Sequence, residues 1–102
     1  MDITPIVVTY GSCISLLLTY RNISGEPEDI TDDTIEVIGA NKPAFGNAVI
    51  SKIDPTQGQA TFFLSSEDVS KLGMGNVNKF RLSRISSDGC RSNTTIIEVQ
   101  VI

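Results

Sequence analysis

The chain of 102 residues contains no histidine and no tryptophan, and it has only two cysteines. Histidine is the commonest general base and a frequent metal ligand, so its absence excludes the usual serine or cysteine triad and most hydrolase chemistry. Long apolar runs are also missing: the longest, residues 14–18, is interrupted by Ser15, whereas a membrane helix needs about 20 apolar residues. We therefore expect neither an enzyme nor a membrane-spanning chain.

Neither sign of charge dominates the chain, and the charged fraction of 20% is ordinary for a folded domain. Eight Lys and Arg oppose twelve Asp and Glu, giving a net charge of −4, and no basic stripe occurs that could neutralise a row of phosphates. We expect no nucleic-acid partner. The apolar fraction of 40% is that of a folded chain, and 102 residues suit one core, so a single domain over 1–102 is predicted.

The amino end lacks the basic head and the long apolar centre of a secretory signal. We expect the chain to be made and kept in the cytoplasm, or exported only as part of a larger object. In that compartment Cys13 and Cys90 are expected to be free thiols, although a bridge between them stays open. Cys13 falls in a strand pattern, where a small buried side chain is expected.

Seven short stretches alternate apolar and polar residues, which is the pattern of strands with one buried face. They are residues 3–9, 13–20, 34–38, 48–53, 60–64, 77–85 and 94–102. The side chains expected to face the core are Ile14, Leu16, Leu18, Tyr20, Ile35, Val37, Phe62, Leu64, Phe80, Leu82, Ile97, Val99 and Val101. Turn residues separate the stretches, notably at 22–27, 54–58 and 87–89.

One helical turn is predicted, at residues 65–73. Ser65 and Asp68 have the spacing of a capping box, and Gly73 is placed to end the helix. The sequence Gly73-Met74-Gly75 is predicted to be a bend and not a phosphate loop, because no strand feeds a helix around it. Residues 39–47 are predicted to be loop.

Strands at this spacing, joined by tight turns and one short connecting helix, predict an all-β fold. The expected architecture is a two-sheet antiparallel sandwich of immunoglobulin-like type with about seven strands. A closed barrel of short strands is the alternative. Because tryptophan is absent and the cysteine spacing differs from that of an antibody domain, only the architecture is predicted.

Two groups of charged residues were considered as sites. The acidic residues Glu26, Glu28, Asp29, Asp32 and Asp33 could supply oxygen ligands to Ca²⁺, but their spacing matches no calcium loop. We expect a solvated loop there, and no metal or other cofactor. The basic residues Lys79, Arg81, Arg84 and Arg91 surround one predicted hairpin and could face an acidic partner, although a solvated strand face is favoured.

Several short motifs follow one another in a characteristic order. They are Gly11-Ser12, Leu17-Leu18-Thr19-Tyr20, Ser24-Gly25-Glu26-Pro27, Asp29-Ile30-Thr31, Gly58 to Phe62, Leu72 to Gly75 and Asp88-Gly89. This order resembles the small Ig-like β-sandwich domains of tailed-bacteriophage virion structural proteins, of the baseplate, tail-fibre-attachment or neck type. The likeness covers nearly the whole chain. The chain departs from the family at one point. Family members usually have an aromatic residue soon after the corner glycine, and the corresponding residue here is Val77 or Phe80.

The resemblance implies a non-enzymatic building block of a virion, made in the cytoplasm of a bacterial host, present in several copies and bound to other structural subunits. Two other roles stay open: a capsid decoration or head-completion protein, or a receptor- or carbohydrate-binding module of a fibre. Sugar-binding faces usually display exposed aromatic side chains. Only Phe45 and Phe63 are expected to be free for that purpose, which disfavours the last role.

An edge strand carries unpaired backbone groups that a neighbouring subunit can cap. We predict that the apolar amino segment makes such a contact. Its candidate residues are Ile3, Pro5, Ile6, Val7 and Val8. The same alternation also fits an ordinary first strand in the chain's own sheet, and the two interpretations stay open.

Overall fold

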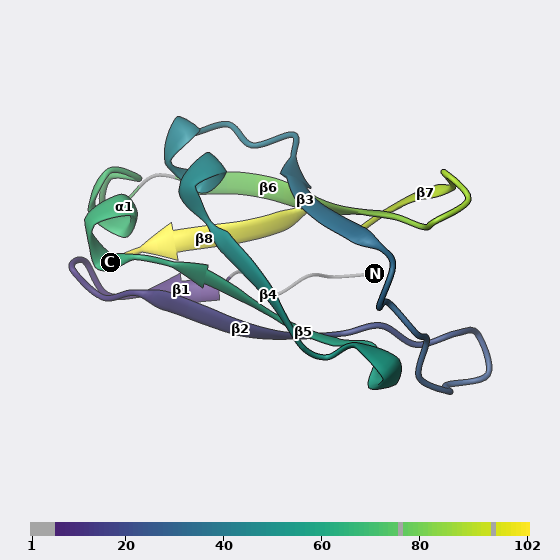
Figure 1. Ribbon diagram of the computed structural model, residues 1–102. Coiled ribbons are helices and arrows are strands. Elements are labelled where there is room, and N and C mark those ends of the chain that lie inside the picture. Colours follow the sequence, from purple (N-terminus) through teal and green to yellow (C-terminus); the bar gives the residue numbers. More distant parts are fainter. Residues whose placement is uncertain (1–5, 76, 95) are drawn as a thin grey trace.

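The computed structural model describes residues 6–75, 77–94 and 96–102, which form two stacked β-sheets (Figure 1). The three-stranded sheet has the order β2 (Ile14–Thr19), β5 (Gln59–Leu64) and β4 (Val49–Asp54). The five-stranded sheet has the order β1 (Ile6–Val8), β8 (Ile97–Val101), β6 (Val77–Ile85) and β3 (Thr34–Ile38), and β7 (Arg91–Asn93) also pairs with β6. The predicted all-β, two-sheet sandwich is confirmed, with eight strands in place of about seven.

The first and last strands are the exception to antiparallel pairing. β1 runs parallel to β8, with Ile6 opposite Val99 and Val8 opposite Val101. The Tyr10 backbone N–H then donates to the Ile102 carbonyl oxygen over 2.8 Å, which continues the pairing beyond β1. The prediction of a wholly antiparallel sandwich is wrong here, because alternation reports which face a residue occupies and not the direction of its neighbour.

The last predicted strand is divided in two. β7 and β8 lie along the same side of β6, and Thr94 stands between them. The Leu82 N–H donates to Thr94 Oγ1 over 3.0 Å, and the Thr94 N–H donates to the Leu82 carbonyl oxygen over 2.9 Å. A side-chain oxygen thus replaces one ladder acceptor where the strand is interrupted.

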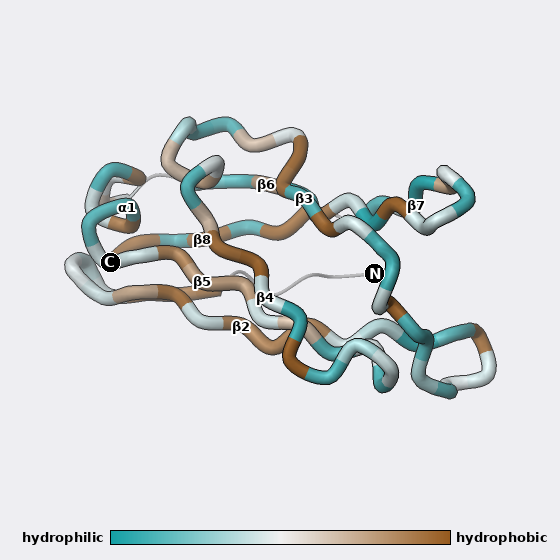
Figure 2. Tube along the Cα trace, in the orientation of Figure 1, coloured by the Kyte–Doolittle hydropathy of each residue, from teal (hydrophilic) through white to brown (hydrophobic). Residues whose placement is uncertain are grey.

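Aromatic rings join the two sheets in the core. Phe62 of β5 and Phe80 of β6 stack with ring centroids 5.0 Å apart, and Phe45 contacts Phe80 at 4.7 Å. All three side chains are fully buried. Every residue predicted to face the core is buried or half-buried, so the predicted inward faces are confirmed. Figure 2 shows these apolar positions recurring along the strands, while the turns are largely hydrophilic.

Phe45 was expected to be free, and this expectation is wrong. It belongs to a 3₁₀ helix, η1 (Pro43–Asn47), that lies in the predicted loop and buries Ala44 and Phe45 against the core. Pro43 presets the backbone for the first helical position. A single turn of this kind has no repeating apolar period, so its buried face leaves no signal in the sequence pattern.

The predicted turn at residues 54–58 is confirmed. A second 3₁₀ turn, η2 (Pro55–Gln57), ends at Gly58, which adopts a left-handed φ of 71°. A Cβ atom on Gly58 would lie 2.4 Å from the Tyr20 carbonyl oxygen and 2.7 Å from that of Glu28. This position therefore needs glycine both for its backbone angle and for the close approach of a neighbouring segment.

The predicted short helix is confirmed as α1 (Ser66–Ser70), which Ser65 caps at its start; the helix is shorter than the predicted 65–73. The Asp68 backbone N–H donates to Ser65 Oγ over 3.2 Å, and that hydroxyl donates to Asp68 Oδ2 over 2.9 Å. Asn47 Nδ2 also donates to Asp68 Oδ1 over 2.9 Å. The hydrogen bonds from Asn47 and Ser65 lower the pKa of the Asp68 carboxyl group. The predicted bend follows, with positive φ at Gly73 and Gly75.

Candidate interaction surfaces

The outer side of the three-stranded sheet carries one charged side chain, that of Asp54, which lies opposite Gln59 at the end of β4. The other outward-facing residues, which we call the neutral face, are Ser15, Leu17, Thr19, Val49, Ser51, Gln59, Thr61 and Phe63. Phe63 lies directly opposite Val49 on one side and Ser15 on the other, and Leu17 lies one position further along. Leu17 is 62% exposed, Val49 56% and Phe63 41%. Large exposed apolar side chains at neighbouring positions of a surface with little charge are typical of a protein-binding patch.

The outer side of the five-stranded sheet is different. Its charged residues, which define the charged face, are Glu36, Lys79, Arg81, Arg91 and Glu98. Lys79 lies directly opposite Glu98 in the register of β6 and β8. Arg91 Nη1 donates to Glu36 Oε1 over 2.9 Å and to Ser83 Oγ over 2.6 Å. Charges of opposite sign are thus neighbours within this face.

Arg84 does not belong to the charged face. It is largely buried where the end of β6 meets the acidic loop, and its Nε donates to Asp33 Oδ2 over 2.5 Å. Its Nη1 donates to Glu28 Oε2. The expectation of a solvated basic face is wrong for Arg84, and that of a solvated acidic loop is wrong for Asp33, which is 8% exposed. The reason is tertiary pairing between residues far apart in the sequence.

The ion pairs at Arg84 change two pKa values. Burial alone would lower the pKa of the Arg84 guanidinium, but the hydrogen bonds to Glu28 and Asp33 outweigh burial and raise it. The guanidinium carbon lies 5.5 Å from the centre of the Tyr20 ring. Burial raises the pKa of the Tyr20 hydroxyl, and the positive charge of Arg84 opposes that change only in part. Arg84 therefore ties the end of β6 to the acidic loop through Glu28 and Asp33.

A polar hollow of about 290 Å³ lies beside this cluster. Its lining residues are Tyr20, Arg21, Glu28, Arg84, Ser92, Asn93 and Thr94. The Tyr20 ring is covered by Arg84, which is itself engaged by two carboxylates. Across the described ranges, no three His, Cys, Asp or Glu side chains are grouped as metal ligands would be.

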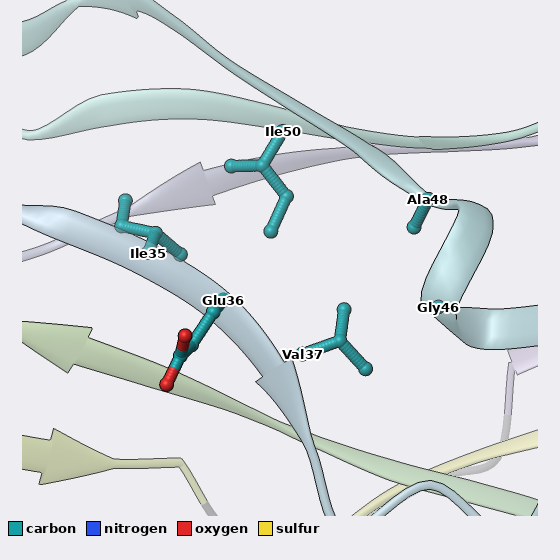
Figure 3. A pocket seen from close by; sticks show the side chains of 6 residues that line it. All are labelled: Ile35, Glu36, Val37, Gly46, Ala48 and Ile50. Atoms are coloured by element: carbon teal, nitrogen blue, oxygen red, sulfur yellow. The ribbon is translucent and has the colours of Figure 1, made fainter.

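A second hollow, of about 330 Å³, lies between β3 and β4 (Figure 3). We call it the edge groove; its lining residues are Ile35, Glu36, Val37, Gly46, Ala48 and Ile50. The side chains of Ile35, Val37, Ala48 and Ile50 project into the space between the two strands, whereas the Glu36 carboxylate points away from it. β3 and β4 are the terminal strands of their sheets, each paired with one neighbour in the described part of the chain.

The predicted partner-contact segment is only partly described. Ile6, Val7 and Val8 form β1, while Ile3 and Pro5 lie outside the described residues. Ile6 and Val8 pack against the core, and Val7 is 56% exposed. The segment is thus a strand of the chain's own sheet, and a partner contact through Val7 stays a prediction.

Two other expectations concern single side chains. Cys13 and Cys90 are free thiols, as expected, but both are exposed. The expectation of a buried Cys13 is wrong, because this residue precedes the first paired position of β2. Among the aromatic residues, Tyr10 is 51% exposed and joins Phe63 as an accessible ring in place of Phe45.

The neutral face was not identified from the sequence, although a signal for it was present. The outward positions of the strands predicted at 13–20, 48–53 and 60–64 are all uncharged. Reading the outward positions as carefully as the inward ones would have found it. The edge groove had no such signal, because it depends on which strands end each sheet.

Comparison of the sequence with known protein families and with curated proteins finds no match. The resemblance to phage virion domains therefore stays a prediction. Over the described ranges, no helix has the length and apolar character needed to cross a bilayer.

Proposed function

We propose that this chain is a non-enzymatic structural or adaptor component of a bacteriophage virion, in the tail, baseplate or neck. It binds other virion subunits through the neutral face. The order of the sequence motifs supports the virion assignment, and the observation that carries the binding surface is the neutral face itself. One residue in five of the chain is charged, yet this side of the sheet has only Asp54, at the end of β4, and exposes Leu17, Val49 and Phe63.

The strand order supports the architecture that the resemblance implies. Immunoglobulin-type sandwiches place strands B, E and D in one sheet and strands G, F and C in the other. The orders β2-β5-β4 and β8-β6-β3 correspond to these two sheets. The agreement supports the immunoglobulin-like assignment, which the order of motifs suggested independently.

The energetics of the neutral face favour a subunit of a multivalent assembly. Covering the exposed fractions of Leu17, Val49 and Phe63 would contribute roughly 3–4 kcal/mol before the cost of association. One such contact is too weak for a lasting complex. When many copies of a chain are held in one particle, each further contact is effectively intramolecular, and weak contacts become sufficient.

The carbohydrate-binding alternative has less support. Stacking on a sugar ring needs an open aromatic face, but Arg84 covers the Tyr20 ring and Phe45 is buried. Of the two exposed rings, Phe63 belongs to the neutral face and Tyr10 lies in the turn after β1. The decoration or head-completion role is equally structural and would use the same face at another position in the particle.

The test is incorporation into particles of the phage whose genome encodes the chain. Two lysines are introduced into the neutral face, Leu17→Lys with Phe63→Lys, and two into the charged face as a matched control, Asn93→Lys with Gln100→Lys. Copy number per particle is measured by quantitative mass spectrometry. We expect the wild type and the control in particles, and at least a tenfold loss of the neutral-face variant.

Folding is monitored in the same variants, because exposed substitutions should change the free energy of unfolding by only about 0.5 kcal/mol each. Absence of the wild-type chain from purified particles would refute the virion role. Retention of the folded neutral-face variant at the wild-type copy number would refute the neutral face as the contact.

A further inference from the structure

β3 is an edge strand whose one guard against pairing is the charged side chain of Glu36. Natural edges are guarded by lysine, proline, a bulge or a covering segment. β4, on the other side of the edge groove, has Lys52 and a register shift between Lys52 and Asp54. β3 has the sequence Thr-Ile-Glu-Val-Ile and pairs with β6 without interruption over residues 34–38. Its outer edge pairs with no other described strand and is therefore an open template.

The edge groove lies directly beneath the position that a strand added to β3 would occupy. Ile35 and Val37 point into it from β3, Ile50 points into it from β4, and Ala48 points into it from the link between η1 and β4 (Figure 3). All four side chains are half-buried. Side chains of a strand alternate between the two faces with a period of two. An added strand would thus place residues i and i+2 in the groove, in step with Ile35 and Val37.

Described residues connect the two sides near each end of the groove. At one end the Lys52 ammonium donates to the carbonyl oxygens of Thr31, over 2.9 Å, and Asp33, so it bridges β4 to the segment before β3. At the other end η1 contributes Gly46 to the lining. The groove therefore accepts a short segment, about the length of β3 itself.

Charge distinguishes another protein from a second copy of this chain as the occupant. Glu36 is the central residue of β3, and its carboxylate faces outward. It pairs with Arg91 within the chain, but its side chain remains 44% exposed and can accept a further basic partner. If two copies paired antiparallel through the centres of β3, two Glu36 side chains would lie directly opposite, which is destabilising. A strand from another chain with Lys or Arg at that outward position would instead form a favourable cross-strand pair.

The architecture also has room for a strand at this position. Variable-type immunoglobulin sandwiches carry additional strands on the G-F-C sheet, and β3 holds the position of strand C at the edge of that sheet. An extra strand beside β3 therefore fits the sandwich without a change in the existing pairing.

We propose that the edge groove accepts an extended segment of another protein chain, with the pattern apolar–basic–apolar. The segment adds to β3 as a further strand, its two apolar side chains fill the groove, and its basic side chain lies over Glu36. Backbone hydrogen bonds supply affinity and the side-chain pockets supply specificity, as in other cases of strand addition. The inference deepens the proposed function, on which it rests for its biological meaning, by stating the chemistry of one contact.

The probe is the blocked peptide Thr-Thr-Val-Lys-Val-Thr-Thr, titrated into the ¹⁵N-labelled chain and followed by NMR. We expect saturable shifts confined to β3, β4 and η1, with slower hydrogen exchange at the outer amides of β3. Two control peptides are matched to the probe: one has both Val replaced by Asp, and the other is N-methylated at the amides that would face β3. Both should bind at least tenfold more weakly.

Variants of the protein test the groove independently of the peptides. Ala48→Leu fills the groove from the residue before β4 and should weaken probe binding at least tenfold. The control Ser51→Leu, nearby on β4 but on the neutral face, should not. Glu36→Lys should reverse the preference, so that Thr-Thr-Val-Glu-Val-Thr-Thr binds more tightly than the lysine probe. This last variant leaves the apolar lining intact and remains informative if Ala48→Leu does not fold.

Equal binding of the probe and the N-methylated peptide would refute strand addition. Equal binding to the wild type and a folded Ala48→Leu would refute the groove, and a concentration-dependent dimer with the same shifted residues would make a second copy the occupant. These outcomes are separate from the proposed function, because peptide binding uses the isolated chain while incorporation is measured in particles.

Discussion

The two outer faces of this sandwich are built on the same strand pattern and differ in what the outward positions carry. On the charged face, Lys79 lies opposite Glu98 and Arg91 pairs with Glu36. Charges of opposite sign are therefore neighbours, and the side chains are also solvated. On the neutral face, Leu17, Val49 and Phe63 are left uncovered. Exposure to water is a sufficient explanation for the residues of the charged face. It does not explain why the neutral face exposes large apolar side chains. The inner faces of the two sheets specify the fold, while the contrast between the outer faces indicates where a partner binds.

The largest expected effect separates the inner and outer sides of one strand. Phe62 and Phe63 are neighbours on β5, yet Phe62 is fully buried and Phe63 is 41% exposed. Phe62→Ala should lower the free energy of unfolding by about 3–5 kcal/mol, because it removes a stacked core ring. Phe63→Ala should lower it by about 1 kcal/mol or less. Urea denaturation of both variants measures the difference.

If Phe62→Ala and Phe63→Ala lowered the free energy of unfolding by similar amounts, Phe63 would have to be packed against other residues in the isolated chain. A small loss in both would mean that the contact between Phe62 and Phe80 contributes little to holding the sheets together. Either result would remove the distinction between inner and outer sides on which the assignment of the neutral face depends.

The second effect separates a buried charge cluster from an exposed ion pair. Arg84→Ala leaves Asp33 buried without its partner and should cost about 2–4 kcal/mol. Arg91→Ala breaks the pair with Glu36, in which both side chains are nearly half exposed, and should cost less than about 1 kcal/mol. Thermal denaturation at low and high salt is the measurement, and only the Arg91 contribution should weaken markedly with salt.

If Arg91→Ala were the more destabilising variant, the charged face would be holding the fold together and not simply solvating it. Arg84→Lys is a useful control, because it keeps the positive charge but cannot donate to Asp33 and Glu28 through a planar fork. The stability of Arg84→Lys should lie between that of the wild type and that of Arg84→Ala.

The smallest effect concerns a carboxylate that lies on neither face. Hydrogen bonds from Asn47 and Ser65 lower the pKa of Asp68 below its usual value of 3.8. A lowered pKa in the folded state contributes stability above the unfolded value, and this contribution is lost as the pH falls through the folded value. The stability difference between the wild type and Asp68→Asn should therefore be constant above about pH 5 and shrink below pH 3.8.

Melting temperatures of both proteins between pH 7 and pH 2.5 give this difference. Asp29 and Asp88 also have lowered pKa values, caused first by hydrogen bonds from Thr31 and Ser86 respectively. They act equally in both proteins and cancel in the comparison. A difference that stayed constant down to pH 2.5 would show that the hydrogen bonds to Asp68 do not depend on its charge.

Local chemistry explains what could be predicted from the sequence. β3 and β6 begin and end at the predicted residues, because their alternation is regular and turn residues flank both strands. The Ser65 cap and the turn at Gly58 were predictable for the same reason, since each depends on residues within a few positions. The neutral face belongs in this class too, because outward positions can be read from the same alternation.

Tertiary pairing explains what could not be predicted. Arg84 meets Asp33 and Glu28 across 51 and 56 residues of sequence, and no local pattern encodes that meeting. Phe45 is buried by a single 3₁₀ turn that is too short to show a period. The edge groove depends on which strands end each sheet, and a list of strands does not contain that order.

The parallel pairing of β1 with β8 has a mechanical consequence. A force that pulled the start of β1 and the end of β8 apart would act along both strands in opposite directions. It would load the Ile6, Val7 and Val8 pairings and the Tyr10–Ile102 hydrogen bond in shear, all at once, instead of unzipping them one by one. If the domain were pulled at the start of β1 and the end of β8, it would therefore resist the separation of these two strands.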